Sequence, residues 1–208
     1  MSLLITFEGI DGSGKSTQVT RVEEWLREAG YDVLLTREPG GSELGEAIRA
    51  ILLDHKWSMI HARTEFLLYS ASRAQMVEEI VKPHLAKPNA IVLIDRYDDS
   101  STAYQGGGRE LGIDAVETVN RFATDKLTPD LTLVLDVDWE TSRTRLSSSR
   151  TDPDRLENSP RDFFERTRQA YHDLCNRYPD RTRLIDATRS PDEVYTIIYS
   201  ELKRLLTK

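Results

Sequence analysis

The apolar residues of this chain fall into five short runs, separated by longer segments in which apolar residues recur at helical spacing. The runs are rich in branched side chains and do not alternate with polar residues; they cover residues 3–7, 32–35, 90–94, 131–137 and 183–185. Continuous apolar runs of this length are typical of strands that are buried on both faces of a parallel sheet. The pattern therefore predicts five buried strands connected by helices.

Two of the intervening segments show clear helix patterns. Residues 15–29 place an apolar group on one face, and Gly30 follows as a residue suited to a left-handed C-terminal position. Residues 42–54 repeat the pattern behind Ser42, the expected N-cap. The side chains expected to face inward are Val19, Val22, Leu26 and Ala29 in the first segment and Leu44, Ile48 and Ile51 in the second. Because strands and helices alternate, we expect right-handed crossovers and an α/β fold with helices on both faces of the sheet.

Length and charge exclude several classes of protein. A chain of 208 residues suits one domain, and a net charge of −7 lacks the basic excess that nucleic-acid binding requires. No apolar stretch approaches the roughly 20 residues of a membrane span, and the N-terminus runs into a strand without a leader. The single cysteine, Cys175, lies in a helical pattern that favours a buried, reduced thiol. We expect a cytoplasmic protein that binds neither nucleic acid nor membrane.

A phosphate-binding loop follows the first strand. The stretch FEGIDGSGKSTQ fits the pattern G-x-x-x-x-G-K-[ST], and it has a strand before it and an amphipathic helix after it. Its backbone N–H groups and the helix N-terminus would surround an anion, Lys15 would reach the outer phosphates, and Ser16 would bind Mg²⁺. The predicted ATP-binding residues of the loop are Gly9, Ile10, Asp11, Gly12, Ser13, Gly14, Lys15, Ser16 and Thr17.

Such a loop alone does not decide between GTPases, ATPases, regulators and kinases. The N-K-x-D motif that reads guanine is missing after the fourth strand, which ends LVLDVDWE. A kinase that acts on a phosphate acceptor needs a second anion site opposite the triphosphate. Three candidates supply one: TREPGG at 36–41, Arg49, and DRYDDSSTAYQGGGR at 95–109.

Five blocks in register resemble thymidylate kinases of the bacterial type. They are FEGIDGSGKST, TREPGGSELGEAIR, FLLYSASRAQ, DRYDDSSTAYQGGGR and PDLTLVLDV, and together they span essentially the whole chain. The resemblance implies the P-loop nucleoside-monophosphate kinase fold, with a five-stranded parallel sheet surrounded by helices. It further implies a homodimer that phosphorylates dTMP to dTDP with ATP and Mg²⁺.

The acceptor base would lie against a predicted helix at 65–81. Tyr69 and Arg73 are four residues apart, so a ring and a forked donor project from one face. On the residues alone, a half-buried helix face with a solvated arginine is the favoured explanation. The resemblance reverses this choice, and it assigns Tyr69 to stacking and Arg73 to thymine O4. It further places Ser101 and Gln105 at the base edge and Tyr104 against the sugar, although turn capping and plain packing are alternatives.

The remaining assignments concern the phosphates. A phosphate acceptor is already anionic, so transfer depends on positioning and charge neutralisation. Arg49 and Arg96 are expected to hold the acceptor phosphate, and Lys15 the donor phosphates. The other expected groups are Asp11 and Glu38 near the sugar hydroxyl and the metal's water shell, and Asp95 as metal-orienting carboxylate, with Asp136 as its rival.

The polar stretch SSSRTDPDRLENSP at 147–160 has no core of its own and is expected to be a mobile lid. Its Arg150 and Arg155 could supply charge at the transferring group, as in the family branch whose phosphate loop lacks an arginine. Arg145 would stack on adenine, with residues 187–189 at the base edge. A solvated surface loop is the simpler alternative.

Two other functions fit parts of the pattern. A deoxynucleoside kinase would use Glu38 as a base on a sugar hydroxyl, but Arg49 and Arg96 would then lack a phosphate. A regulatory ATPase needs a water-positioning residue and a partner surface, and neither is evident in the sequence.

Overall fold

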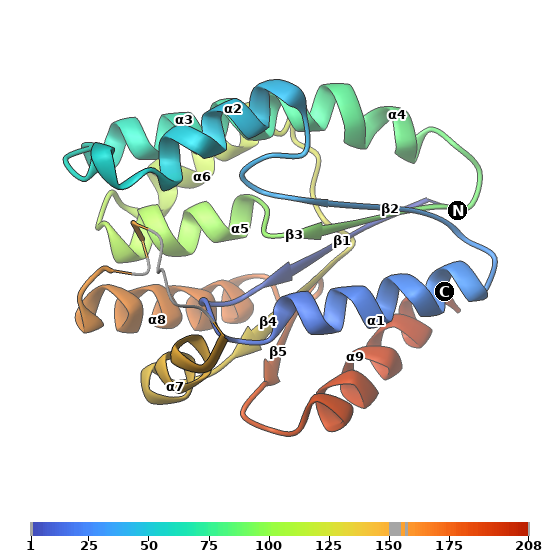
Figure 1. Cartoon of the computed structure of the whole chain (residues 1–208). Coiled ribbons are helices and arrows are strands. Elements are labelled where there is room, and N and C mark those ends of the chain that lie inside the picture. Colours follow the sequence, from blue (N-terminus) through green and yellow to red (C-terminus); the bar gives the residue numbers. More distant parts are fainter. Residues whose placement is uncertain (1, 150–154, 157, 208) are drawn as a thin grey trace.

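The computed structural model describes residues 2–149, 155, 156 and 158–207. Within these residues, five strands form one parallel sheet in the order β2-β3-β1-β4-β5 (Figure 1). The strands are β1 (Leu3–Glu8), β2 (Asp32–Arg37), β3 (Ala90–Asp95), β4 (Leu131–Asp136) and β5 (Thr182–Asp186). All five predicted strands are confirmed, and so is the fold class.

Helices connect the strands on both sides of the sheet. They are α1 (Lys15–Glu28), α2 (Glu43–Leu53), α3 (Ala62–Met76), α4 (Lys82–Leu85), α5 (Asp98–Ser101), α6 (Ile113–Ala123), α7 (Trp139–Ser149), α8 (Arg161–Arg177) and α9 (Pro191–Leu206). A 3₁₀ turn, η1 (His55–Trp57), precedes α3, and π-helical turns form η2 (Val77–Val81) and η3 (Thr102–Gly108). No helix in the described part of the chain is long and apolar enough to cross a membrane.

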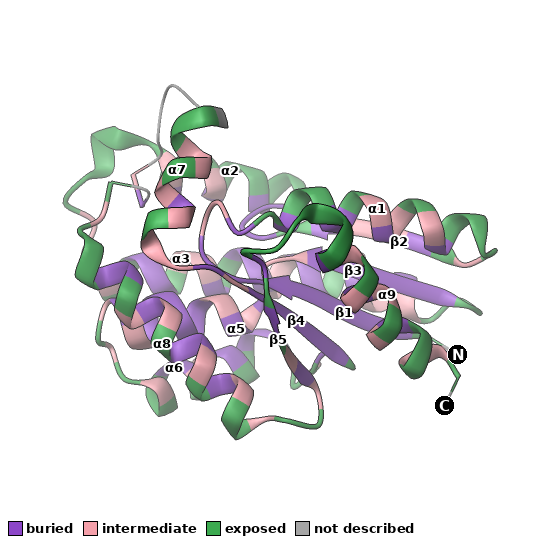
Figure 2. Cartoon of the chain, turned by 90° about the horizontal axis from the view of Figure 1, so that it is seen from below, coloured by how far each residue is buried: buried purple, intermediate pink, exposed green. Residues whose placement is uncertain are grey.

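The sheet is buried between the helical layers, as Figure 2 shows in purple. Along β1, Leu3, Ile5 and Phe7 belong to the cluster that contains the inner faces of α1 and α9. Leu4 points the other way, into a second cluster with Met76, at the end of α3. Every residue of β1 is buried, which explains why this strand reads as a continuous apolar run.

The strand register brings three strand ends to one edge of the sheet. Phe7 of β1 pairs with Asp95 of β3, and Arg37 of β2 pairs with the same Asp95. The phosphate loop after β1, the TREPGG segment after β2 and the segment after β3 therefore start side by side. Crevices at the carboxyl ends of parallel strands are the usual ligand sites of such sheets.

Parts of the predicted helix faces are wrong. Val19, Val22 and Leu26 are buried in α1 as expected, but Ala29, at the C-cap, is exposed. In α2, Leu44 is 53% and Ile51 is 41% exposed, whereas Gly45, Ile48 and Leu52 are buried. The reason is that α2 packs against α3 and the TREPGG segment: a Cβ on Gly45 would stand 2.6 Å from the Gly40 carbonyl oxygen.

The first residues of the segment predicted as a lid are helical. Helix α7 continues through Ser149, and the hydroxyls of Ser147 and Ser148 donate to the carbonyls of Thr144 and Arg145. Such bonds satisfy carbonyls in the last helical turn. Arg150 and residues 151–154 and 157 lie outside the described residues.

Two glycines with positive φ make a matched test of the backbone at the phosphate loop. Gly9 has a φ of 130° and a Cβ there would stand 2.3 Å from the Leu135 carbonyl oxygen; Gly30 has a φ of 88° and open space around it. Gly9→Ala should lower the free energy of unfolding by about 3 kcal/mol or more, and Gly30→Ala by about 1–2 kcal/mol. Urea unfolding measures both; equal losses would contradict the close approach at Gly9.

Candidate active site

The phosphate loop links the end of β1 to the start of α1. Gly14, with a φ of 91°, is the N-cap of α1, and it has no side chain with which to occupy the first N–H groups of the helix. The ammonium of Lys15 curls over the loop and donates to the carbonyls of Gly9, at 2.9 Å, and Ile10, at 3.1 Å. The helix N-terminus and this cation therefore face the same space, as an anion site requires.

The Lys15 side chain is nearly buried. Burial and the neighbouring charge of Arg96 lower the pKa of Lys15 to about 8, although Asp95 and Asp11 act in the opposite direction. A phosphate in the loop would favour the charged form and relieve this destabilisation.

Arg96 joins the phosphate loop to the segment after β3. Its Nη1 donates to the Gly9 carbonyl at 2.9 Å, and its Nη2 donates to Oδ1 of Asp11 at 2.6 Å. The guanidinium also lies 5.1 Å from the centre of the Tyr104 ring, whose hydroxyl donates to Asp11 at 3.2 Å. Burial raises the pKa of Asp11, but Arg96 and Lys15 outweigh it and bring the value down to about 2. Asp11 is thus ionised at neutral pH and is a weak base.

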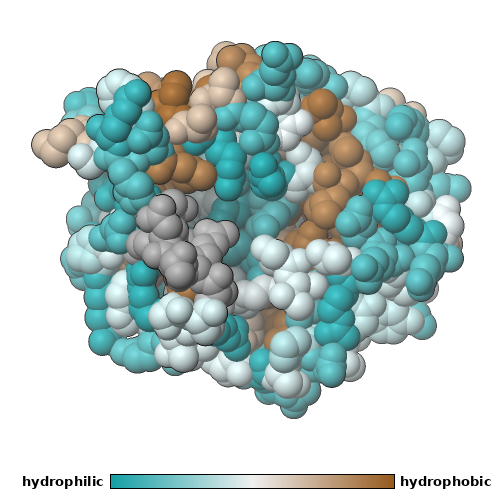
Figure 3. Space-filling view, in the orientation of Figure 1, coloured by the Kyte–Doolittle hydropathy of each residue, from teal (hydrophilic) through white to brown (hydrophobic). Residues whose placement is uncertain are grey.

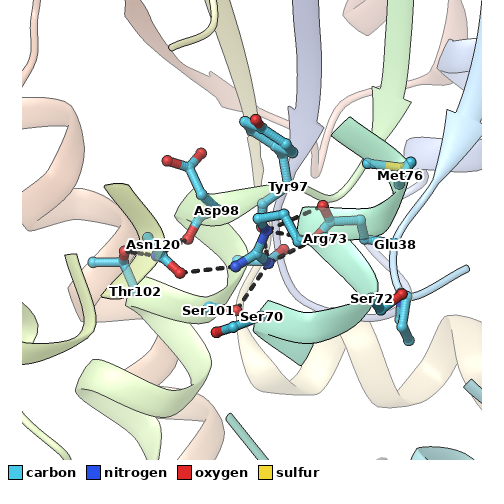
Figure 4. A network of polar contacts seen from close by, with 12 residues as sticks. Glu38, Ser70, Ser72, Arg73, Met76, Tyr97, Asp98, Ser101, Thr102 and Asn120 are labelled. Carbon is cyan, nitrogen blue, oxygen red and sulfur yellow. Dashed lines mark hydrogen bonds and ion pairs between the residues drawn. The ribbon is translucent and has the colours of Figure 1, made fainter. Parts of the chain in front are cut away.

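Arg73 stands at the centre of a second polar cluster (Figure 4). It is fully buried, and its Nε and Nη2 donate to Glu38 at 2.8 Å and 2.6 Å. Nη1 donates to Asn120 at 2.8 Å, and Nη2 also donates to Ser101 at 3.0 Å. Burial raises the pKa of Glu38 against the lowering effect of Arg73. The guanidinium is held from several sides, in a fixed orientation.

One cavity of about 540 Å³ receives both clusters. On the face shown in Figure 3, hydrophilic side chains lie in a hollow that hydrophobic groups partly border. The predicted residues that line it are Asp11, Gly12, Gly14, Lys15, Ser16, Thr17, Glu38, Arg49, Tyr69, Arg73, Asp95, Arg96, Ser101, Tyr104, Gln105 and Arg145. Gly9, Ile10 and Ser13 do not line it; Gly9 and Ile10 support Lys15 from behind through their carbonyls.

Arg155 of the predicted lid is not among the residues that line the cavity. Its Nη2 pairs with Glu65 at 2.6 Å, and its Nε donates to the Leu52 carbonyl at 2.9 Å. The neighbouring Leu156 does line the cavity. Arg150, the other predicted lid arginine, lies outside the described residues.

The two rival carboxylates after the strands differ in their surroundings. Asp136 is bound to Arg168 at 2.7 Å and to His172 at 3.0 Å, and it does not line the cavity. Asp95 lines the cavity, and its Oδ1 is buried without a hydrogen-bond partner among the described residues. An unpartnered carboxylate oxygen in a cavity that Ser16 also lines fits a hard cation or its bound water.

Arg145 lines the cavity next to the phosphate loop. It donates to the carbonyls of Gly12, at 3.4 Å, and Ala187, at 2.9 Å. Arg145 thereby connects the phosphate loop with the segment predicted to meet the adenine edge.

Sequence reasoning missed some of the residues that support the site. Glu8 is fully buried and accepts from the Tyr97 backbone N–H at 2.7 Å and from the Tyr171 hydroxyl at 2.9 Å. Burial and Asp99 raise the pKa of Glu8 to about 7. Asn120, the partner of Arg73, was missed as well. An acidic residue at the end of a buried strand was a usable signal for Glu8, whereas nothing in the sequence points from Asn120 to Arg73.

The comparisons with known proteins agree with this geometry. The family model for thymidylate kinases matches residues 7–198 of the chain. The chain belongs to the thymidylate kinase family. It is therefore a nucleoside-monophosphate kinase of the family that uses ATP to phosphorylate dTMP to dTDP, as the sequence predicts.

Its relatives cover the chain almost end to end. The thymidylate kinase of Halothermothrix orenii is 48% identical over 208 residues, which is 99% of each chain. That of Thermosipho africanus is 46% identical over 204 residues, covering 98% of this chain and 99% of its own. The crystal structure of thymidylate kinase from Ehrlichia chaffeensis superposes with a TM-score of 0.78 at 32% identity, over 97% of this chain and 98% of that one.

The lowered pKa of Lys15 predicts proton uptake when ATP binds. Burial and Arg96 lower the pKa of the Lys15 ammonium to about 8. A bound phosphate would raise that pKa again. Binding should take up about half a proton at pH 8 and less than about a tenth at pH 6.5. Calorimetry in buffers of different ionisation enthalpy measures the uptake, and Lys15→Arg corrects for the protons of ATP itself. Proton uptake that is the same at pH 8 and pH 6.5 would contradict the assignment of this proton to Lys15.

Proposed function

We propose that this thymidylate kinase transfers the γ-phosphoryl group of ATP to dTMP inside the 540 Å³ cavity, with Mg²⁺ and without a general base. The observation that carries the proposal is that Lys15, Arg49 and Arg96 line the same cavity as Tyr69 and Arg73. Cationic side chains that can bind donor and acceptor phosphates therefore share one cavity with Tyr69 and Arg73, which can bind a nucleobase. Asp11, ionised by Arg96, is unsuited to removing a proton, and a phosphate acceptor needs none removed.

The donor nucleotide would occupy the phosphate-loop end. The N–H groups from Gly9 to Thr17 bind the phosphates, Lys15 neutralises the outer ones, and Arg145 lies over the adenine. When bound, Mg²⁺ supplies positive charge to the phosphate oxygens. Ser16 would hold the ion directly, and Asp95 would orient it or its waters through the unpartnered Oδ1.

The acceptor would occupy the opposite end. Arg49, fixed by its bond to the Pro39 carbonyl at 2.9 Å, and Arg96 hold the dTMP phosphate. Tyr69 stacks on thymine while Arg73, Ser101 and Gln105 bond to its edge. Tyr104 lies against the sugar and excludes a 2′-hydroxyl, and Asp11 and Glu38 lie near the 3′-hydroxyl.

The lid assignment divides between its two arginines. We infer that Arg150 supplies charge at the transferring group. Arg155, which is bound to Glu65 and the Leu52 carbonyl, shares that task only if it leaves these partners; in place, it anchors the end of the lid against the acceptor side.

A panel of acceptors tests the proposal. ADP release with ATP and Mg²⁺ should occur with dTMP, and neither with thymidine nor without an acceptor. Release with thymidine would favour a deoxynucleoside kinase, and release without acceptor a regulatory ATPase.

Arg49→Ala should raise KM for dTMP by about 10–100-fold and leave KM for ATP within about twofold, because it removes a charged contact to the acceptor alone. Equal effects on both values would contradict its placement.

We also propose that two copies of the chain associate through exposed apolar groups on neighbouring helices. Leu44 on α2, Leu67 on α3 and Phe122 on α6 are 53%, 57% and 89% exposed. α3 packs against both other helices, and Figure 3 shows hydrophobic groups over α2 at the upper left. Apolar groups gathered on adjoining helices are typical of a protein interface.

Sedimentation measures this association. Leu67→Glu should raise the dissociation constant of the dimer by at least about tenfold, because it places a charge in an apolar contact. Leu184→Glu, on the edge strand β5, is the matched control, since Leu184 is 44% exposed but lies away from these helices. Equal behaviour of the two variants would place the interface elsewhere.

A further inference from the structure

A buried carboxylate that the reaction itself does not use lies behind the acceptor end of the cavity. Glu65, in the first turn of α3, is fully buried. Its Oε1 accepts from Nε2 of Gln105 at 3.0 Å and from Nε of Arg109 at 3.2 Å. Its Oε2 pairs with Nη2 of Arg155 at 2.6 Å and with Nη2 of Arg109 at 3.2 Å. A carboxylate that is removed from water but meets this many donors is tightly fixed in place.

Glu65 and its partners adjoin the cavity wall. Gln105 lines the cavity itself, and Leu156, next to Arg155, lines it as well. Tyr69 lines it one helical turn after Glu65 on the same face of α3. A change at Glu65 would therefore move residues that are proposed to surround the base.

The charge of Glu65 decides the orientation of the Gln105 amide. Burial raises the pKa of Glu65, but Arg109, Gln105 and Arg155 outweigh it and leave the pKa below its usual value. The side chain is thus ionised and can only accept hydrogen bonds. The NH₂ end of the Gln105 amide must face Glu65, because the carbonyl end would be repelled.

This orientation leaves Gln105 with an acceptor for a ligand. Its Nε2 is engaged by Glu65, while its Oε1 accepts no hydrogen bond from any described residue. Thymine and uracil carry a donor, N3–H, whereas cytosine has an unprotonated acceptor at N3. An acceptor fixed toward the base thus favours the first two and repels the third.

We propose that Glu65 is a positioning residue that fixes Gln105 as a hydrogen-bond acceptor and thereby selects bases with an N3–H donor over cytosine. This inference rests on the proposed function, in which Gln105 meets the edge of the acceptor base. Arg73, as a donor, would reinforce the choice, since it suits a carbonyl at C4 and opposes the amino group of cytosine.

Competition binding of dTMP and dCMP to the whole enzyme tests the proposal. Glu65→Gln removes the charge at nearly constant shape, so the amide of Gln105 can turn its donor toward the base. The preference for dTMP over dCMP should narrow by about tenfold or more. Arg109→Met is the control: it removes a partner of Glu65 but leaves the contact with Gln105, and the preference should change by less than about twofold.

A second background separates positioning from general support of the fold. If Glu65 acts through Gln105, Glu65→Gln should change the preference by less than about twofold in a chain that already carries Gln105→Leu. Should Glu65→Gln fail to fold, Glu65→Asp keeps the charge but withdraws it from Gln105, and the same narrowing is expected.

The outcomes are distinct. A folded Glu65→Gln enzyme with an unchanged preference overturns the role of Glu65, and so does an equal narrowing with Arg109→Met. A wild-type enzyme that does not phosphorylate dTMP instead refutes the proposed function.

Discussion

The contact between Arg96 and the phosphate loop is the interaction on which the rest of the site depends. The guanidinium binds the Gly9 carbonyl and Asp11, so the segment after β3 and the loop after β1 form one unit. The backbone of Arg96 is left-handed, with a φ of 69°, which a non-glycine residue keeps only where its surroundings enforce it. The enforcing contacts are the Phe7 carbonyl, which accepts from the Arg96 N–H, and Glu8, which accepts from the next N–H. The pairing of β1 with β3 thus fixes the position of the Arg96 guanidinium.

Buried charge is arranged for a ligand at the expense of the empty protein's stability. Burial and Arg96 lower the pKa of Lys15, and Asp95, Asp11 and Glu8 oppose this effect. An anion that binds beside Lys15 and Arg96 is attracted to both cations. This attraction is stronger where water is largely removed, which is the basis of electrostatic preorganisation. The pairs Arg73–Glu38 and Arg155–Glu65 act differently. Buried ion pairs contribute little net stability because desolvation offsets their attraction, so their importance here is the fixed geometry that they give the cavity wall.

Much of this arrangement could be predicted from the sequence, and the reason is locality. The strand before Gly9, the glycines and Lys15 are contiguous, and their spacing carries their chemistry. The strands are identified by burial on both faces. By contrast, the inward face of α2 was misassigned, because packing against α3 and the close approach of Gly45 to Gly40 override the apolar pattern.

Residues that act across long sequence separations were harder to assign. The choice between Asp95 and Asp136 depends on Arg168 and His172, which engage Asp136 from α8. The role of Glu65 could not be predicted from the sequence, because its partners Gln105, Arg109 and Arg155 follow it by 40 to 90 positions. Long-range contacts of this kind come from topology, which periodicity does not determine.

The central claim is that one cavity, with Arg96 at its junction, binds donor and acceptor together. An inhibitor that joins adenosine and thymidine through a chain of phosphates tests it most directly. Calorimetry and steady-state kinetics should show one molecule bound per chain, competitive with both ATP and dTMP. Competition with ATP alone, with dTMP still able to bind, would contradict the account.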